Sequence, residues 1–293
     1  MEKYYEKYEQ RYKAVYAAGA DQWGYTPDDA TLNAVLRNWV SAHDLQGKTV
    51  LELCCGEGGA GVILSKLGCG YHGIDLAPSA LETAKRLLSP FPAASVERLD
   101  LAMETIHGEY DAALDVMGFH MLLADQDRAA YLRNVYQALS PGAPMLFFNE
   151  AYSANGYEGT VDSYEQWLEI TGEDFVGAVK KYAKKGSEKV EVMIPRMPGR
   201  YMRESGYRAE LEAAGFVVDE FRIENDWRAS ILPLRCQLAT FVSTPSSRFC
   251  ISRTASSVGT GITYNGPIIS DHSSKNYREH GKIQQESDKE TTP

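Results

Sequence analysis

The residues best suited to chemistry lie in a glycine-rich turn that follows an apolar strand. Gly56, Gly58 and Gly61 satisfy the spacing G-x-G-x-x-G, in which glycine lets the backbone turn tightly and lets a ligand approach it closely. Asp75 follows 19 residues after Gly56, at the end of the next predicted strand. An acidic residue there can accept hydrogen bonds from both hydroxyls of a ribose. The spacing therefore predicts a site for a ribose-bearing cofactor.

Two further acids favour S-adenosylmethionine over NAD, since both cofactors carry such a ribose. Glu52 lies within the strand just before the turn, where a carboxylate suits the amino group of a sulfonium cofactor better than it suits a pyrophosphate. Asp100, followed by Leu101, comes after the third predicted strand, where an acid can accept from an adenine amino group. Two alternatives stay open: Glu52 is paired internally, or Asp100 caps a helix.

The adjacent cysteines Cys54 and Cys55 do not predict a metal site. They lack the C-x-x-C spacing of zinc ligands, and the sequence has no second pair. Five cysteines with two of them adjacent also make a poor disulfide framework. We therefore expect reduced thiols and a cytoplasmic protein.

Two side chains are candidates for contact with a substrate. His120 follows the fourth predicted strand and Glu150 ends the fifth, both at the carboxyl end of the sheet, where open α/β folds bind ligands. His120 is a candidate general base because its unperturbed pKa lies near neutrality; the alternative is that it only packs. Glu150 is a candidate contact of the substrate.

Tyrosines recur every four residues near the N-terminus, at Tyr4, Tyr8, Tyr12 and Tyr16. Such a stripe on one helix face indicates core packing, or a lid that covers the site together with Trp23. The two interpretations are compatible along one helix. We expect residues 1–29 to form a lid, with Tyr16 and Trp23 near the substrate.

Strand and helix signals alternate through residues 1–243. The predicted strands are 48–54, 71–75, 94–99, 110–117 and 144–149, and the predicted helices are 2–18, 30–43, 59–67, 78–88 and 126–139. This alternation predicts a doubly wound parallel sheet with helices on both faces. After a helical cap insertion over 151–203, with helices at 163–170 and 174–185, a helix at 204–214 and strands at 216–223 and 237–242 follow. The last two strands lack a helix between them, so we expect an antiparallel pair.

These segments together resemble the class I S-adenosylmethionine-dependent methyltransferases of the small-molecule type. LELCCGEGG resembles the family's cofactor loop, GIDLAP its ribose-binding strand, YDAALDVMGFHML its fourth strand, ALSPGAPMLFF the passage to the fifth and GYRAELEAAGF its last helix. The resemblance implies a Rossmann-like sheet of order 3-2-1-4-5-7-6 with strand 7 antiparallel. Carried over by position, the cofactor contacts are Glu52, Cys54, Gly56, Gly58, Asp75, Leu76, Asp100, Leu101 and, near the methionyl group, Asp115. Cys54 stands where the family usually has glycine, which an ordinary backbone conformation would tolerate.

Charge and composition narrow the class of partner. The chain of 293 residues carries 30 Lys and Arg against 40 Asp and Glu, a net charge of −10, which counts against nucleic-acid binding. The sequence has no apolar run of the roughly 18–20 residues that a membrane helix needs. Residues 244–293 hold 15 Ser or Thr among 50 residues and are expected to form a disordered or weakly ordered tail.

We therefore expect methyl transfer from S-adenosylmethionine to a small-molecule acceptor by direct displacement, with no metal. The alternatives are a protein methyltransferase, a non-catalytic S-adenosylmethionine-binding protein and an NAD(P)-dependent oxidoreductase. The sequence leaves the acceptor and the oligomeric state open.

Overall fold

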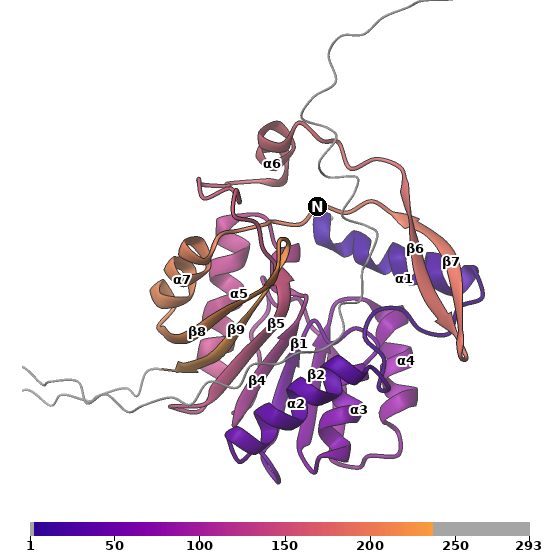
Figure 1. Cartoon of the computed structure of the whole chain (residues 1–293), viewed down its shortest axis with the longest axis vertical. Helices are drawn as coiled ribbons and strands as arrows, with labels where there is room; N and C mark the ends of the chain where they lie inside the picture. The colour runs from indigo at the N-terminus through magenta and orange to yellow at the C-terminus, as the bar shows by residue number, and fades with distance from the viewer. Residues whose placement is uncertain (1–2, 237–293) are drawn as a thin grey trace, which may run out of the picture. The chain divides into compact units, whose positions relative to one another are not determined.

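A computed structural model describes residues 3–236, which form a mixed sheet covered by helices (Figure 1). The sheet strands are β1 (Thr49–Leu53), β2 (Gly70–Asp75), β3 (Ala94–Arg98), β4 (Ala112–Val116), β5 (Pro144–Ala151), β8 (Phe216–Asn225) and β9 (Arg228–Cys236). The helices are α1 (Tyr8–Ala17), α2 (Ala30–Ala42), α3 (Gly59–Lys66), α4 (Pro78–Leu88), α5 (Asp125–Ala138), α6 (Tyr164–Thr171) and α7 (Glu204–Ala213), with short 3₁₀ turns at Tyr4–Lys7 and Phe119–Met121.

The strand order is β3-β2-β1-β4-β5-β9-β8. The strands from β1 to β5 pair in parallel, and β9 is antiparallel to both β5 and β8. This arrangement confirms the predicted doubly wound topology and its single antiparallel strand. Because all five parallel strands end at one edge, the segments that follow them meet there.

Two apolar layers cover the two faces of the sheet. Alternate residues of β1 belong to different layers, with Leu51 and Leu53 in one and Val50 in the other. The first layer holds residues of α5 and α7, including Tyr131 and Leu211, and the second holds residues of α2, α3 and α4. Helices on both faces bury the central parallel strands β1, β4 and β5 almost completely, whereas the edge strand β3 has no fully buried residue.

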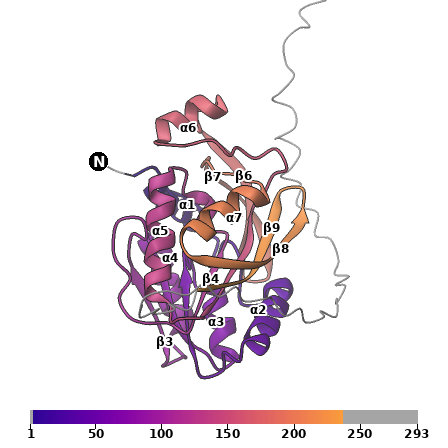
Figure 2. The ribbon, with the colours of Figure 1, turned by 90° about the vertical axis from the view of Figure 1, so that its left-hand side faces the viewer.

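The insertion between β5 and α7 differs from the prediction. The expected helix at 163–170 is present as α6, but the expected helix at 174–185 is wrong. That segment is the strand β6 (Ala178–Lys185), which pairs with β7 (Glu188–Pro195) in a separate antiparallel hairpin. Its four lysines, Lys180, Lys181, Lys184 and Lys185, fall on both faces of the strand, because successive side chains of a strand point to opposite faces. The insertion is therefore only partly helical, and α6 lies beyond the sheet in both views (Figure 1, Figure 2).

The hairpin packs on the N-terminal helix. Val15 of α1 and the following Ala20 form a small apolar cluster with Ala183, Val192 and Ile194 of the two hairpin strands. Polar contacts extend this junction: Asp21 N–H donates to the Lys184 carbonyl at 2.7 Å, and the Lys184 ammonium lies 2.8 Å from Asp28. Residues far apart in sequence thus form one structural unit.

The end of the sheet also differs from the prediction. The final strand is β9 at Arg228–Cys236, whereas the predicted strand at 237–242 and the predicted tail at 244–293 lie outside the described residues. No helix in the described part of the chain is long and apolar enough to cross a membrane.

Candidate functional site

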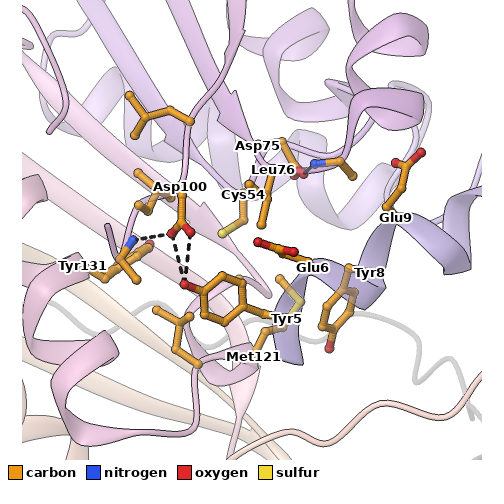
Figure 3. Close-up of a pocket in the computed structure, with 16 residues that line it drawn as sticks. Tyr5, Glu6, Tyr8, Glu9, Cys54, Asp75, Leu76, Asp100, Met121 and Tyr131 are labelled. Carbon is orange, nitrogen blue, oxygen red and sulfur yellow. Dashed lines mark hydrogen bonds between the residues drawn. The ribbon is translucent and has the colours of Figure 1, made fainter. Parts of the chain in front are cut away.

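A cavity lies at the carboxyl ends of the first four strands, beside the N-terminal segment (Figure 3). The open space within it, solvent at its mouth included, is about 570 Å³. Five residues that the sequence predicted as cofactor contacts line it: Cys54, Asp75, Leu76, Asp100 and Leu101. The other lining residues include Tyr5, Glu6, Tyr8, Glu9, Gly118, Met121, Leu122 and Tyr131.

The glycine-rich turn after β1 adopts left-handed backbone conformations. Cys54, Gly56 and Gly58 have φ values of 53°, 52° and 75°. A side chain on Gly56 would also meet the Tyr12 hydroxyl, 2.6 Å from the position of its Cβ. Cys54 therefore lacks the ordinary backbone conformation that would tolerate a side chain in place of glycine, and a non-glycine residue here carries strain.

Asp75 holds this turn against the start of α4. Its Oδ2 accepts from the Gly56 N–H at 2.7 Å, and its Oδ1 accepts from the Ala77 N–H at 2.8 Å. Burial raises the pKa of the Asp75 carboxyl, whereas these backbone donors lower it. Each carboxylate oxygen keeps a further lone pair for a ligand in the cavity. Its contact with a ribose stays a prediction.

Asp100 faces the cavity from the segment after β3. The Tyr5 hydroxyl donates to its two oxygens at 3.2 and 3.1 Å, as Figure 3 shows, and the Ala102 N–H donates to it at 3.0 Å. The carboxylate thus fixes the turn that follows it and also lines the cavity. The alternative interpretation, a helix cap, is wrong, because residues 101–104 form a turn and no helix. Leu76 and Leu101 add apolar wall.

His120 is oriented by Glu150. Its Nδ1 lies 2.9 Å from Glu150 Oε2, and its backbone N–H donates to the same oxygen at 2.9 Å. Burial lowers the pKa of His120 to about 3, and the Arg228 guanidinium acts in the same direction. The neutral ring therefore donates from Nδ1 and carries its lone pair on Nε2.

Asp115 lies behind this pair and does not line the cavity. It accepts from the Gly118 N–H at 2.6 Å and from the Tyr131 hydroxyl, and it shares a hydrogen bond with Glu150. Burial and the neighbouring charge of Glu150 raise the pKa of Asp115 well above its usual range. Glu150 Oε1 is buried and has no hydrogen-bond partner among the described groups.

Glu52 lies away from the cavity, in the opposite layer of the sheet. It is buried, and the Tyr71 hydroxyl donates to it at 2.5 Å. Burial raises the pKa of Glu52 to about 8. The structure thus gives Glu52 an internal partner, which was the alternative interpretation of this residue.

Tyr16 and Trp23, the predicted substrate residues of the lid, both contact Glu57, which the sequence analysis did not single out. The Tyr16 hydroxyl donates to Glu57 Oε1 at 2.7 Å, and the Trp23 N–H donates to Glu57 Oε2 at 2.6 Å. Burial raises the pKa of Glu57 to about 7. Glu57 thus connects residues 16–23 to the glycine-rich turn. Its position between Gly56 and Gly58 was the sequence feature from which this role could have been predicted.

The tyrosine stripe divides along its length. Tyr4 and Tyr5 are buried in the core, as the packing interpretation expected. Tyr5 and Tyr8 also line the cavity, and Tyr12 approaches Gly56. Glu6, Glu9, Met121 and Tyr131 carried no sequence signal. They reach the cavity from the 3₁₀ turn before α1, from α1, from the 3₁₀ turn after β4 and from α5.

The charges of the cavity discriminate between candidate cofactors. Four acids line it, Glu6, Glu9, Asp75 and Asp100, and among the described lining residues there is no Lys or Arg. Such a lining suits a cationic ligand with hydroxyls and an adenine, as in S-adenosylmethionine, and disfavours the pyrophosphate of NAD. Within residues 3–236 no group of three or more His, Cys, Asp or Glu side chains could hold a metal ion.

Comparison with known proteins agrees with this geometry. Residues 50–142 match the family model described as "Methyltransferase domain". The cypemycin N-terminal methyltransferase of Streptomyces sp. is 28% identical over 115 residues, which are 36% of this chain and 43% of that protein. The ubiquinone biosynthesis O-methyltransferase of Paraburkholderia phytofirmans is 30% identical over 119 residues, which are 40% of this chain and 51% of that protein. The chain thus spans about half the length of these curated relatives.

Solved structures share the fold. An S-adenosylmethionine-dependent methyltransferase from Clostridium acetobutylicum aligns with a TM-score of 0.55 at 13% identity, covering 80% of this chain and 99% of the other. An amino pentose methyltransferase from Micromonospora echinaspora aligns with a TM-score of 0.53 at 16% identity, covering 77% and 96%. The fold and the family match confirm the predicted resemblance to the class I S-adenosylmethionine-dependent methyltransferases and agree with the predicted cofactor.

Proposed function

We propose that this chain transfers a methyl group from S-adenosylmethionine to a small-molecule acceptor. The observation that carries the proposal is the acidic cavity at the carboxyl ends of the parallel strands, lined by Asp75 and Asp100 and without a lining Lys or Arg among the described residues. The matched methyltransferase domain, residues 50–142, contains this cavity's central segments. When bound, S-adenosylmethionine supplies a methyl group on a sulfonium that an acceptor atom displaces.

The protein's part is mainly to bind and align. Asp75 is suited to the ribose and Asp100 to the adenine amino group, while Leu76 and Leu101 provide apolar walls. Gly56 and Gly58 allow the close approach of the backbone. Holding two reactants in line and excluding water is worth about 7–11 kcal/mol in favourable cases.

His120 would take the proton that the acceptor loses. Its Nδ1–H is committed to Glu150, so Nε2 is the nitrogen available to accept a proton from a hydroxyl or an amine. Glu150 acts through His120 as a positioning residue, which refines its predicted role as a substrate contact. Asp115 would in turn hold Glu150.

The elements that cover the cavity, α1 and the β6–β7 hairpin packed on it, favour a small acceptor. Tyr8 and Glu9 of α1 line the cavity, and the β6–β7 hairpin packs on the same helix. The relative named as a ubiquinone biosynthesis O-methyltransferase supports a small-molecule acceptor. We place the reaction in the cytoplasm, consistent with the free thiols of Cys54, Cys55 and Cys69.

The test is methyl transfer from deuteromethyl-labelled S-adenosylmethionine into small molecules extracted from cells, followed by mass spectrometry. We expect labelled product with the full chain. We expect His120→Gln to lose about 10²–10⁴-fold in rate while S-adenosylmethionine affinity stays unchanged. His107→Gln, at an exposed histidine, is the matched control. Label found only in protein would favour a protein methyltransferase, and cofactor binding without any transfer would favour a binding protein.

A further inference from the structure

Two arginines near His120 differ from the other buried or half-buried arginines in having no acidic partner. Six arginines of the described chain form ion pairs with carboxylates: Arg128, Arg196, Arg200, Arg203, Arg208 and Arg222. Arg11 and Arg228 form no ion pair with any residue that the structure describes. A guanidinium taken from water without a counter-charge is costly, and a site that retains one is suited to an anion.

Arg228 is the stronger case. It begins β9 opposite Ala151, the last residue of β5, and so lies at the carboxyl end of that strand. Its Nε and Nη1 are buried and have no hydrogen-bond partner among the described groups. The guanidinium lies 4.5 Å from the ring centroid of Trp227, which fixes its plane without satisfying its donors.

Arg11 approaches the same region from α1. Its Nε donates to the Pro195 carbonyl at 2.8 Å, and its guanidinium carbon lies 5.2 and 5.5 Å from the ring centroids of Tyr8 and Trp23. Burial lowers the pKa of Arg11. The aromatic rings and one carbonyl hold this cation in place, and no carboxylate neutralises it.

Arg11, Arg228 and His120 do not line the cavity themselves, but each neighbours its lining: His120 stands between the lining residues Gly118 and Met121 in the chain. The Tyr8 side chain, which lines the cavity, is within electrostatic reach of Arg11 and of Arg228, and so is His120. The cavity lining itself is acidic. The site therefore has an acidic half, suited to a cationic cofactor, and beside it a region where Arg11 and Arg228 form no ion pair with a described residue, although Glu150 lies within electrostatic reach of Arg228.

We propose that the methyl acceptor carries a carboxylate and that Arg228, assisted by Arg11, binds this carboxylate beside His120. The inference rests on the proposed methyl transfer and names the class of acceptor for it. Charge-assisted hydrogen bonds from the buried Nε and Nη1 would supply the partner that these donors lack. An acceptor with a hydroxyl or amine within reach of His120 and a carboxylate on Arg228 meets both requirements.

Binding of a carboxylate would also strengthen the base. The charged groups around His120 are the acids Glu150 and Asp115 and the cations Arg228, Arg128 and Arg11. Positive charge opposes protonation of the imidazole. Neutralising Arg228 with the carboxylate of the acceptor removes part of this opposition when a proton must be taken.

The experiment uses benzoate and its neutral isostere benzamide as probes of the full chain saturated with S-adenosylhomocysteine. Ligand-observed NMR titration gives the affinity for each probe. We expect wild-type protein to prefer benzoate by about tenfold or more, the range of a hydrogen bond to a charged group. Arg228→Gln should abolish the preference, Arg228→Lys should retain part of it, and Arg11→Gln should reduce it. Arg222→Gln, at an exposed arginine of the same hairpin, should leave it unchanged.

Equal binding of benzoate and benzamide, binding of neither at millimolar concentration, or an unchanged preference in folded Arg228→Gln would overturn the proposal. If Arg228→Gln fails to fold, the same comparison with Arg228→Lys and Arg11→Gln decides. Calorimetry with S-adenosylhomocysteine alone reports on the proposed function separately. A chain that binds this cofactor product and ignores the charge of the probe contradicts the carboxylate site and leaves the methyltransferase proposal standing.

Discussion

Asp75 holds two parts of the cavity wall at once, because its two oxygens accept from the N–H groups of Gly56 and Ala77. Asp75→Asn retains one carbonyl acceptor but loses the charge and one acceptor. We expect S-adenosylmethionine affinity to fall about ten- to a hundredfold, the range of a hydrogen bond to a charged group. Isothermal titration calorimetry measures this loss.

The control for Asp75 is Glu109→Gln, at an exposed acid before β4 and hence at the other end of the sheet. It should leave the affinity unchanged. Wild-type affinity in folded Asp75→Asn would exclude the ribose role of this residue.

Glu52 gives a prediction about stability and pH. Its pKa is raised by burial to about 8, above the value of about 4.3 in an unfolded chain. The native state therefore binds this proton more tightly, so the contribution of Glu52 to stability is present below about pH 4 and declines as the pH rises to about 8. Glu52→Gln keeps an acceptor for the Tyr71 hydroxyl and has no charge to bury.

We expect Glu52→Gln to unfold with nearly wild-type free energy at pH 5 and to be more stable by about 3 kcal/mol at pH 9, an order-of-magnitude figure from the linkage relation. Urea unfolding at both pH values measures the difference. An equal difference at pH 5 and pH 9 would show that Glu52 does not titrate with a raised pKa. The affinity of the same variant for S-adenosylmethionine tests the predicted cofactor contact.

Single residues show what the sequence could and could not predict about the site. Cys54, Asp75 and Asp100 line the cavity as expected, because each follows a parallel strand and these ends meet at one edge. Glu52 lies one residue from Leu51 and Leu53, so the two-residue period of a strand sends it to the opposite layer. That period was readable from the sequence. The orientation of His120 by Glu150 depends on two distant segments and was not.

At the scale of elements, the prediction from local sequence was wrong at the β6–β7 hairpin, where a helix was expected and a strand is found. The segment 178–185 holds several lysines and no apolar alternation, and only its pairing with 188–195 makes it a strand. Strand formation depends on such partners more than helix formation does. The parallel core was predictable because each strand and helix of it carries its own apolar pattern.

The junction between this hairpin and α1 yields a further prediction. Ile194 is fully buried in the cluster with Val15 and Ala183. Ile194→Ala should weaken the docking of the hairpin by about 2–4 kcal/mol. Hydrogen exchange should accelerate in α1 and β6–β7 and remain unchanged in β1 and β4.

Met193→Ala is the matched control for Ile194, because Met193 is the neighbouring residue on the same strand and its side chain is 55% exposed. It should leave the exchange of α1 unchanged. If Ile194→Ala accelerates exchange throughout the sheet instead, α1 and the hairpin unfold with the core and do not form a separate unit.

At the scale of the whole molecule, the charges are unevenly distributed around the site, which the net charge of −10 does not show. Acids gather in the cavity, while Arg11 and Arg228 lie near His120 without acidic partners in the described chain. The resemblance to the methyltransferases predicted the strand order, and the alternation of strands and helices predicted that acids at the strand ends meet at one edge. The cations were not predictable, because α1 and the β8–β9 hairpin meet only in the folded chain.

The most direct test of the whole account is calorimetric titration of the full chain with S-adenosylmethionine and, separately, with NAD. The acidic cavity predicts saturable binding of S-adenosylmethionine in the micromolar range, and NAD binding weaker by at least about a hundredfold, because its pyrophosphate would meet acids and no lining cation. Binding of NAD as tight as that of S-adenosylmethionine, or no binding of S-adenosylmethionine by folded protein, would contradict the account.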